Sequence, residues 1–590
     1  MNLEQKLAEA VKEGCRILFG KEMAAPIQPT NPEFEGSHTV VCFALTKTSR
    51  KSPEETARLL GEYLAANTSL VSKYQAAKGF LNLSLHDSFW RDVLNELKNP
   101  DEGLAVHKGK EIMVEYSSPN TNKPLHLGHL RNNFLGFSVA NLFRAIGYTV
   151  HTVQIINDRG IHICKSMAAW KLFGNGETPE SSGMKGDHLA GKYYVLFDKQ
   201  HKKEIKELLE QGLSQEVAEK QAPIMLAATD MLRQWENKDP AAMALWRKMN
   251  GWVYDGFAQT YRRMGVTFDK LYYESDTYLL GRSEALQGVE NGVFFKKEDG
   301  SVWVDLTADG LDQKALLRAD GTSVYMTQDI GTAILRFRDF PRIEGQVYTV
   351  GNEQEYHFKA LFLILKKLGY AWADKCRHLS YGMVDLPSGK MKSREGTVVD
   401  ADDLMEEIVS EAKKQTMELG KIEGRSAEEI DALSERVGQG ALKFFLLKVD
   451  PKKSMLFDPT ESIRLQGHTG PFIQYTYARI AALLRKAAEQ NLFPEAAKNI
   501  SLKETERDLI IALSRYRQTV HEAARQYSPA LIANYAYELA KAYNHFYQSV
   551  PVLNEEDKSL VVFRLTLSKA VADVVQKCLA ILGIDSPERM

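Results

Sequence analysis

The chain has 590 residues, of which 44% are hydrophobic and 26% are charged, and its 75 basic residues nearly balance 77 acidic ones. This length predicts about four domain-sized units, and the composition is ordinary for a globular protein. A net charge of −2 excludes nucleic-acid binding through overall charge, so any such binding depends on local basic clusters. No apolar stretch approaches the ~18 residues of a membrane span, so we expect no membrane anchor.

The five cysteines are far apart and form no Cys-x-x-Cys pair. This spacing argues against a zinc cluster and a disulfide framework, and it is typical of a reducing compartment. The N-terminal segment has the pattern of a charged amphipathic helix without the apolar centre of a signal peptide. We therefore expect a cytoplasmic protein without zinc.

Residues 1–106 show the pattern of a separate N-terminal α+β domain. Helical and alternating apolar patterns follow one another, and the turn formers at 99–103 are typical of a linker. The predicted elements are helices near 3–13 and 53–65 and strands at 39–45 and 79–85.

Residues 112–156 predict a strand, a helix and a second strand. An apolar run typical of a buried parallel strand is followed by turn formers, then by apolar residues at helical spacing as far as Gly147. The β-branched run at 149–156 predicts the second strand. Such a βαβ unit binds ligands at the carboxyl ends of its strands.

Two histidines stand where the first of these strands gives way to the helix. His126 and His129 flank Gly128. A helix start favours anions, because its free N–H groups and its dipole both attract negative charge. Imidazoles there can donate to phosphate oxygens, so we predict a phosphate site at His126 and His129.

Residues 107–455 are predicted to form one doubly wound α/β domain around this unit, with a largely helical insertion at about 165–315. Further strands are expected at 346–350 and 379–384, with a helix between them. The lysine-rich loop at 387–396 suits phosphoryl or nucleotidyl transfer, in which cations neutralise charge in the transition state.

The remaining residues, 456–590, are helical in pattern throughout and predict an all-α helix bundle. No zipper-like heptads occur, so we expect a monomer. The predicted helices lie near 470–490, 504–527, 529–549 and 556–582.

Two blocks of the chain resemble one family. The block at 117–131, Ser-Ser-Pro-Asn-Thr-Asn-Lys-Pro-Leu-His-Leu-Gly-His-Leu-Arg, resembles the HxGH signature of class I aminoacyl-tRNA synthetases, in the form of the arginine-specific members. The block that begins at Lys390 resembles their KMSKS loop, which closes on ATP phosphates. The resemblance covers nearly the whole chain and implies a Rossmann-like catalytic domain. It assigns catalysis to His126, His129 and Lys390, and ATP binding also to Gly128, Gly382, Met383, Val384, Met391, Lys392, Ser393 and Arg394.

The second block departs from the family pattern, because Ser393 stands where the family has its second lysine. Lys392, Arg394 and Lys123 are the candidate replacements. We favour Lys123, because some arginine-specific members lack the second loop lysine and use the lysine just before the HxGH block. A smaller departure is Gln328, where the family more often has arginine.

Specificity for arginine requires carboxylates, because guanidinium offers a planar fork of N–H donors that a carboxylate meets in bidentate fashion. The resemblance assigns the arginine side chain to Glu115 and Asp329. Tyr325 precedes Asp329 by four residues and shares its helical face. The other positions that the resemblance assigns to the amino acid are Ser118, Asn120 and Gln354.

The resemblance assigns tRNA binding to both ends of the chain. The N-terminal domain matches the place of one that touches the outer corner of tRNA, with a packing domain as the alternative. The C-terminal bundle matches the anticodon-binding domain. Tyr475, Tyr477 and Arg479 are candidates to stack on or pair with unpaired bases, with helical core as the alternative.

The expected enzyme is a ligase. It activates L-arginine with ATP and Mg²⁺ to arginyl-adenylate and transfers arginine to the 3′ adenosine of tRNA(Arg), without an organic cofactor or a resident metal. Three alternatives stay open: a small nucleotidyltransferase that shares the HxGH fold, a synthetase for another amino acid, and a catalytically silent RNA-binding relative. Pyrophosphate exchange with and without tRNA discriminates among them.

Overall fold

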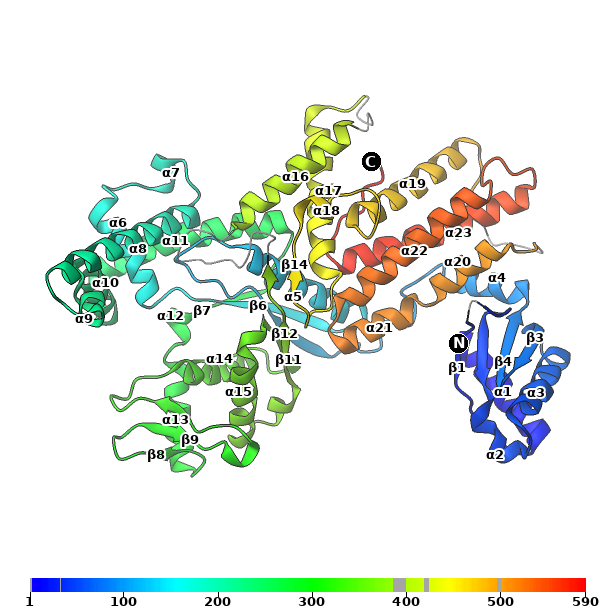
Figure 1. Cartoon of the computed structure of the whole chain (residues 1–590), viewed down its shortest axis with the longest axis horizontal. Coiled ribbons are helices and arrows are strands. Elements are labelled where there is room, and N and C mark those ends of the chain that lie inside the picture. Colours follow the sequence, from blue (N-terminus) through cyan, green and yellow to red (C-terminus); the bar gives the residue numbers. More distant parts are fainter. Residues whose placement is uncertain (1–2, 32, 386–398, 419–423, 496–499) are drawn as a thin grey trace.

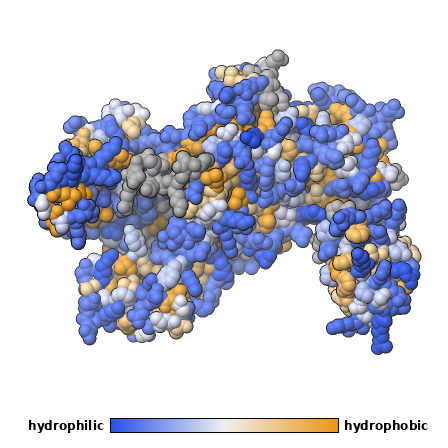
Figure 2. All heavy atoms as spheres, in the orientation of Figure 1, coloured by the Kyte–Doolittle hydropathy of each residue, from blue (hydrophilic) through white to orange (hydrophobic). Residues whose placement is uncertain are grey.

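The computed structural model describes residues 3–31, 33–385, 399–418, 424–495 and 500–590. A central parallel sheet carries a helical arm and a smaller α+β lobe at one end, and a helix bundle at the other (Figure 1). The N-terminal domain stands beside this bundle. Hydrophobic residues are scattered in small groups over the face shown in Figure 2 and form no single band. None of the described helices combines the length and apolar character that crossing a bilayer requires.

The central sheet has five parallel strands in the order β12-β11-β5-β6-β7. Helix α5 joins β5 to its neighbour β6. Helix α15 joins β11 to β12, and these two strands lie toward the opposite edge of the sheet from β6. The direction of winding therefore reverses between β5 and β11, and ligands bind at the carboxyl ends of the strands at such a switch point. The bounds are β5 (Glu111–Glu115), α5 (Leu127–Ala145), β6 (Thr149–Ile156), β7 (Lys270–Tyr273), β11 (Ile343–Gly351), α15 (Glu355–Lys367) and β12 (Cys376–Tyr381).

The predicted single insertion at about 165–315 needs correction, because β7 lies within it and pairs with β6 in the main sheet. The chain leaves the sheet twice. Helices α6 to α11 form the arm before β7, and a lobe with the antiparallel sheet β10-β9-β8 follows it. The bounds are α6 (Ile161–Phe173), α7 (Pro179–Ser182), α8 (Gly186–Glu210), α9 (Gln215–Gln221), α10 (Pro223–Glu236), α11 (Pro240–Met264), α12 (Glu274–Thr277), α13 (Leu280–Glu290), β8 (Phe295–Lys296), β9 (Val302–Val304), β10 (Lys314–Leu317) and α14 (Tyr325–Asp339).

The C-terminal part is helical, as predicted, and packs against α5 and the N-terminal domain. The helix predicted at 504–527 is divided by Arg515 into α20 and α21. The short parallel pair β13 and β14 links the catalytic domain to the segment before the bundle. The bounds are β13 (Val384–Asp385), α16 (Ala401–Glu418), α17 (Ala427–Leu447), β14 (Met455–Leu456), α18 (Pro459–Ser462), α19 (Gly470–Glu489), α20 (Glu504–Ser514), α21 (Tyr516–Gln526), α22 (Pro529–Ser549) and α23 (Lys558–Ile581).

The N-terminal domain has a four-stranded antiparallel sheet in the order β1-β2-β4-β3. Strand β3 was not predicted. Its residues do not alternate between buried and exposed positions. The strand predicted at 39–45 stops at Val41, where a 3₁₀ turn begins. Arg507 bonds Asp87 at 2.8 Å and so ties the bundle to α4. The bounds are α1 (Leu3–Phe19), β1 (Ile27–Pro29), β2 (His38–Val41), α2 (Thr46–Ser49), α3 (Pro53–Asn67), β3 (Val71–Ala77), β4 (Phe80–Leu85) and α4 (Asp87–Glu96).

Candidate active site

His126 and His129 cap the start of α5 at the switch point of the sheet. His126 Nδ1 accepts from the Gly128 N–H at 3.1 Å, and His129 Nδ1 accepts from the His126 N–H at 3.2 Å. The ring centroids are 4.0 Å apart. Because both Nδ1 atoms accept hydrogen bonds, each neutral ring carries its hydrogen on Nε2. Both rings therefore keep an Nε2–H donor for a ligand.

The surroundings of these rings hold them neutral at pH 7. Burial, reinforced by the charge of Lys123, lowers the pKa of His126 to about 3. Burial, the neighbouring His126 ring and Lys123 lower the pKa of His129 well below its ordinary value. Gly128 allows the close approach, since a Cβ there would lie 3.0 Å from His126 Cε1. The helix start thus presents N–H donors without a charged imidazole.

The segment Val399–Ala401 lies directly beside this helix start. The Leu127 N–H donates to the Val399 carbonyl at 3.2 Å, and the Ala401 N–H donates to the Leu125 carbonyl at 3.0 Å. The predicted loop residues that precede this segment lie outside the described residues, namely Lys390, Met391, Lys392, Ser393 and Arg394. The described chain therefore resumes at Val399, next to the two histidines.

Lys123 belongs to the same part of the molecule. It lines an open pocket between the start of α5 and helix α8, together with His126, His188 and Asp400. This places the favoured replacement for the missing loop lysine beside the histidine pair. Its effect on the pKa of both histidines agrees with that proximity.

Arg131, which the sequence reasoning overlooked, organises the predicted ATP-binding residues Gly382, Met383 and Val384. Its side chain is buried and donates to the carbonyls of Gly382 at 2.7 Å, Met383 at 3.2 Å and Lys453 at 2.8 Å. Val384 pairs with β14. Arg131 on α5, two residues after His129, therefore fixes the backbone next to β12.

Glu115 ends β5 and is already engaged by the protein. One carboxylate oxygen, Oε2, forms an ion pair with the buried Arg336 of α14, and Gln346 donates to it at 3.4 Å. The other oxygen, Oε1, accepts from the Ser118 hydroxyl at 3.1 Å. Glu115 and Ser118 therefore lie together, but the guanidinium of Arg336 takes one edge of the carboxylate.

The other predicted arginine-binding residues lie in more exposed positions. Asp329 Oδ2 lies 2.6 Å from His357 Nε2, with the Asp329 side chain 42% exposed. Tyr325 is 77% exposed on the same helix. Asn120 and Gln354 are also exposed. This side of the site is open.

Glu274 is a carboxylate near Asp329 that the sequence reasoning missed. It starts α12 directly after β7, at the carboxyl edge of the sheet. Burial raises its pKa to about 7; Arg159 lowers this pKa, and Asp158 and Asp329 raise it. Its position directly after a strand of the sheet could have identified Glu274 from the sequence. The prediction of one long insertion at 165–315 hid that strand.

The three predicted tRNA-binding residues on α19 divide into two kinds. Tyr477 is 9% exposed, and its hydroxyl accepts from Gln576 at 3.1 Å, as a core residue would. Tyr475 and Arg479 line an open groove beside α22. The Arg479 guanidinium lies 5.0 Å from the Tyr475 ring centroid. Of these three residues, Tyr477 alone therefore fits the alternative of a residue in the helical core.

A doubly wound parallel sheet with an HxGH block at the helix start after β5 defines the catalytic domain of a class I aminoacyl-tRNA synthetase. Three family models match this chain: "tRNA synthetases class I (R), catalytic domain" over residues 92–458, "DALR anticodon binding domain" over 473–590 and "Arginyl tRNA synthetase N terminal domain" over 1–85.

Full-length relatives and solved structures agree with these models. An arginine–tRNA ligase of Bacteroides thetaiotaomicron is 56% identical, and one of Flavobacterium psychrophilum is 54% identical, each over 100% of both chains. The fold resembles that of the Thermus thermophilus arginyl-tRNA synthetase, with a TM-score of 0.77, 24% identity and 100% of both chains covered. The chain belongs to the arginyl-tRNA synthetase family. It is a ligase that joins arginine to tRNA(Arg), with ATP as a substrate.

This family membership resolves the alternatives left by the sequence. A small nucleotidyltransferase does not account for matches to both tRNA-synthetase terminal domains. A synthetase for another amino acid does not account for the full-length arginine-specific relatives. The same relatives exclude a catalytically silent RNA-binding protein. The presence of both HxGH histidines at the helix start agrees with this conclusion.

Proposed function

We propose that His126 and His129 stabilise negative charge on the phosphates of ATP while arginyl-adenylate forms. An oxygen of the arginine carboxylate attacks the α-phosphorus, the bond from that phosphorus to the bridging oxygen breaks, and pyrophosphate leaves. The neutral Nε2–H donors and the N-terminus of α5 act where charge develops, so they contribute to the rate more than to arginine binding. The paired capping bonds of the two rings are the observation that carries this proposal.

Lys123 and Lys390 supply cations to the same phosphates. The position of Lys123 in the pocket beside His126 supports this role. ATP enters as its magnesium complex, with the ion carried by phosphate oxygens, and no zinc is required. In the second step a hydroxyl of the terminal tRNA adenosine attacks the activated carboxyl carbon, and AMP leaves.

Gly382, Met383 and Val384 are proposed to contact ATP through the backbone that Arg131 holds. The remaining ATP-binding residues in the proposal are Gly128, Met391, Lys392, Ser393 and Arg394.

Arginine selection is proposed to depend on an excess of negative charge at the open side of the site. Glu115 pairs with Arg336 and Glu274 with Arg159, while Asp158 and Asp329 add negative charge near Glu274. A bound guanidinium would offset the remaining charge, and it meets a carboxylate in bidentate fashion.

Asp329 is proposed as the principal partner of the guanidinium, with Glu274 as a second one. Glu115 contributes through its Oε1 edge, because Oε2 holds Arg336. Tyr325 lies one helical turn from Asp329 and completes the side-chain pocket. Ser118, Asn120 and Gln354 hold the amino and carboxylate groups.

The proposed division of labour assigns tRNA contact to the N-terminal domain (1–106), chemistry to residues 107–455 and anticodon binding to residues 456–590. Tyr475 and Arg479 are the contacts that we favour, because they line a groove, whereas Tyr477 supports them from the core. A cytoplasmic monomer is the proposed working form.

The testing experiment is ATP–pyrophosphate exchange with each of the twenty amino acids, with and without total tRNA. Exchange with arginine only, and only with tRNA present, is the expected result, because members of this family generally require tRNA before they activate arginine. Exchange with a different amino acid would remove the pocket assignment and leave the phosphate site intact.

A further inference from the structure

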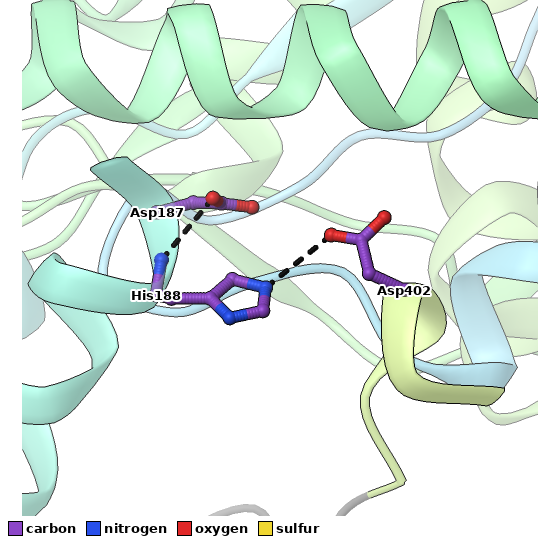
Figure 3. A group of neighbouring side chains, drawn as sticks. All are labelled: Asp187, His188 and Asp402. Carbon is purple, nitrogen blue, oxygen red and sulfur yellow. Dashed lines mark hydrogen bonds and ion pairs between the residues drawn. The ribbon is translucent and has the colours of Figure 1, made fainter. Parts of the chain in front are cut away.

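A cluster of charged side chains joins the first turn of α8 to the segment at the start of α16 (Figure 3). His188 points from α8 toward Asp402, with its Nε2 3.3 Å from Asp402 Oδ2. The same nitrogen lies 3.4 Å from Asp400 Oδ2. Asp187 lies beside His188 and is fully buried. We call the group formed by Lys185, Asp187, His188, Asp400 and Asp402 the α8–α16 cluster.

The arrangement of Asp187, His188 and Asp402 would permit metal binding, since their ligand atoms lie within 4.8 Å of one another. Lys185 argues against a metal. Its ammonium forms an ion pair with Asp402 and lies 3.1 Å from Asp187 Oδ2. A lysine nitrogen therefore already stands between the two carboxylates and offsets their charge.

The charges within the cluster depend on one another. Burial would raise the pKa of Asp402, but bonds from His188 and Lys185 hold it at about 2. The bond to Asp402 in turn raises the pKa of His188. Thr260 of α11 donates to Asp402 Oδ1 at 3.1 Å. The Asp402 carboxylate is therefore held from two helices of the arm.

The opposite side of the same segment lies on the histidine site. Asp400 pairs with His126 in an isolated antiparallel bridge. The flanking backbone bonds join Val399 to Leu127 and Ala401 to Leu125. His126, His188 and Asp400 also line one pocket. Residues 399–402 thus stand between the cluster and the start of α5.

We propose that Lys185 and His188 are positioning residues, which hold Val399–Asp402 against His126 and so set the geometry of the ATP-phosphate site. The inference rests on the phosphate role proposed for His126 and His129, and it adds a dependence on the helical arm. The arm is required for ATP use even though neither residue touches the reacting atoms.

The test uses the full-length variant Asp402→Asn, which keeps the side-chain shape and removes the charge. We expect the KM for ATP in pyrophosphate exchange to rise about tenfold, as for loss of a charge-assisted bond, and the KM for arginine to stay within about twofold. Asp403→Asn is the matched control, because Asp403 is the exposed neighbour on the same helix. It should leave both constants unchanged.

His188→Gln provides a second variant at a half-buried position, in case Asp402→Asn does not fold. It should raise the KM for ATP in the same direction, with a melting temperature close to that of the parent. Equal changes in both KM values, or wild-type constants in a folded variant, would overturn the proposal. So would stabilisation of the ligand-free parent by Mn²⁺ or Zn²⁺ that Asp402→Asn abolishes, because the cluster would then be a metal site.

His129→Ala in the same assay separates this inference from the proposed function. If His129→Ala keeps a normal kcat, the phosphate role fails. If His129→Ala is inactive while folded Asp402→Asn and His188→Gln behave as the parent, the phosphate role stands and only the positioning role fails.

Discussion

The proposed phosphate side and the proposed arginine side of the active site are built in opposite ways. On the proposed phosphate side, the rings of His126 and His129 bond the backbone of their own helix start. The arginine side takes its groups from β5, α12, α14 and the 3₁₀ turn before α15, and several of them are exposed. The histidine pair is therefore held by local bonds, whereas the arginine side depends entirely on how distant elements pack. Substitutions should accordingly affect rate on one side and substrate binding on the other.

The largest effect is expected from His129→Ala. The variant loses a donor that acts on charge in the transition state, so kcat in pyrophosphate exchange should fall roughly 10²–10³-fold. The KM for arginine should change less than about threefold, because His129 lies on the phosphate side. His545→Ala, at an exposed histidine of α22, is the control and should behave as the parent. A near-normal kcat for His129→Ala would remove the distinction between the two sides.

The converse effect is expected from Asp329→Asn. Loss of the charge that we propose faces the guanidinium should raise the KM for arginine roughly 100-fold, as for removal of one partner of a charged pair. The KM for ATP should stay within about threefold. Asp320→Asn is the matched control, because Asp320 is exposed and bonds only its own turn among the interactions described. An increase confined to the KM for ATP would contradict the arginine assignment.

The sequence predicted the backbone that carries His126 and His129, because that backbone depends on adjacent residues. The structure has both the strand at Glu111–Glu115 and the helix start at His126. The ion pair between Glu115 and Arg336 spans 221 positions along the chain, so no local sequence pattern predicts it. Glu274 was missed for a related reason, since its strand, β7, is short and lies between two excursions from the sheet.

A smaller effect is expected from Arg131→Lys. Arginine donates to several carbonyls from two planar nitrogens, whereas lysine has one nitrogen and cannot span them. We expect the free energy of unfolding to fall by about 2 kcal/mol, together with a higher KM for ATP. Urea unfolding and exchange kinetics measure the two effects. Arg144→Lys, at an exposed position on the same helix, is the control. Unchanged unfolding and an unchanged KM for ATP would show that the carbonyl bonds do not shape the ATP side.

The smallest effect concerns the neutrality of the histidine pair. The folded pKa of His129 is depressed, so below the ordinary value near 6.5 the unfolded chain binds a proton that the folded chain refuses. The free energy of unfolding therefore falls as the pH falls. At pH 5.5 this costs about 1.4 kcal/mol relative to pH 7.5, and His129→Asn should abolish that part of the loss. Urea midpoints of both proteins at the two pH values measure it, with His545→Asn as the control. If parent and His129→Asn lose the same stability, the pKa of His129 is the same in the folded and unfolded chain, and burial does not hold the ring neutral below pH 6.5.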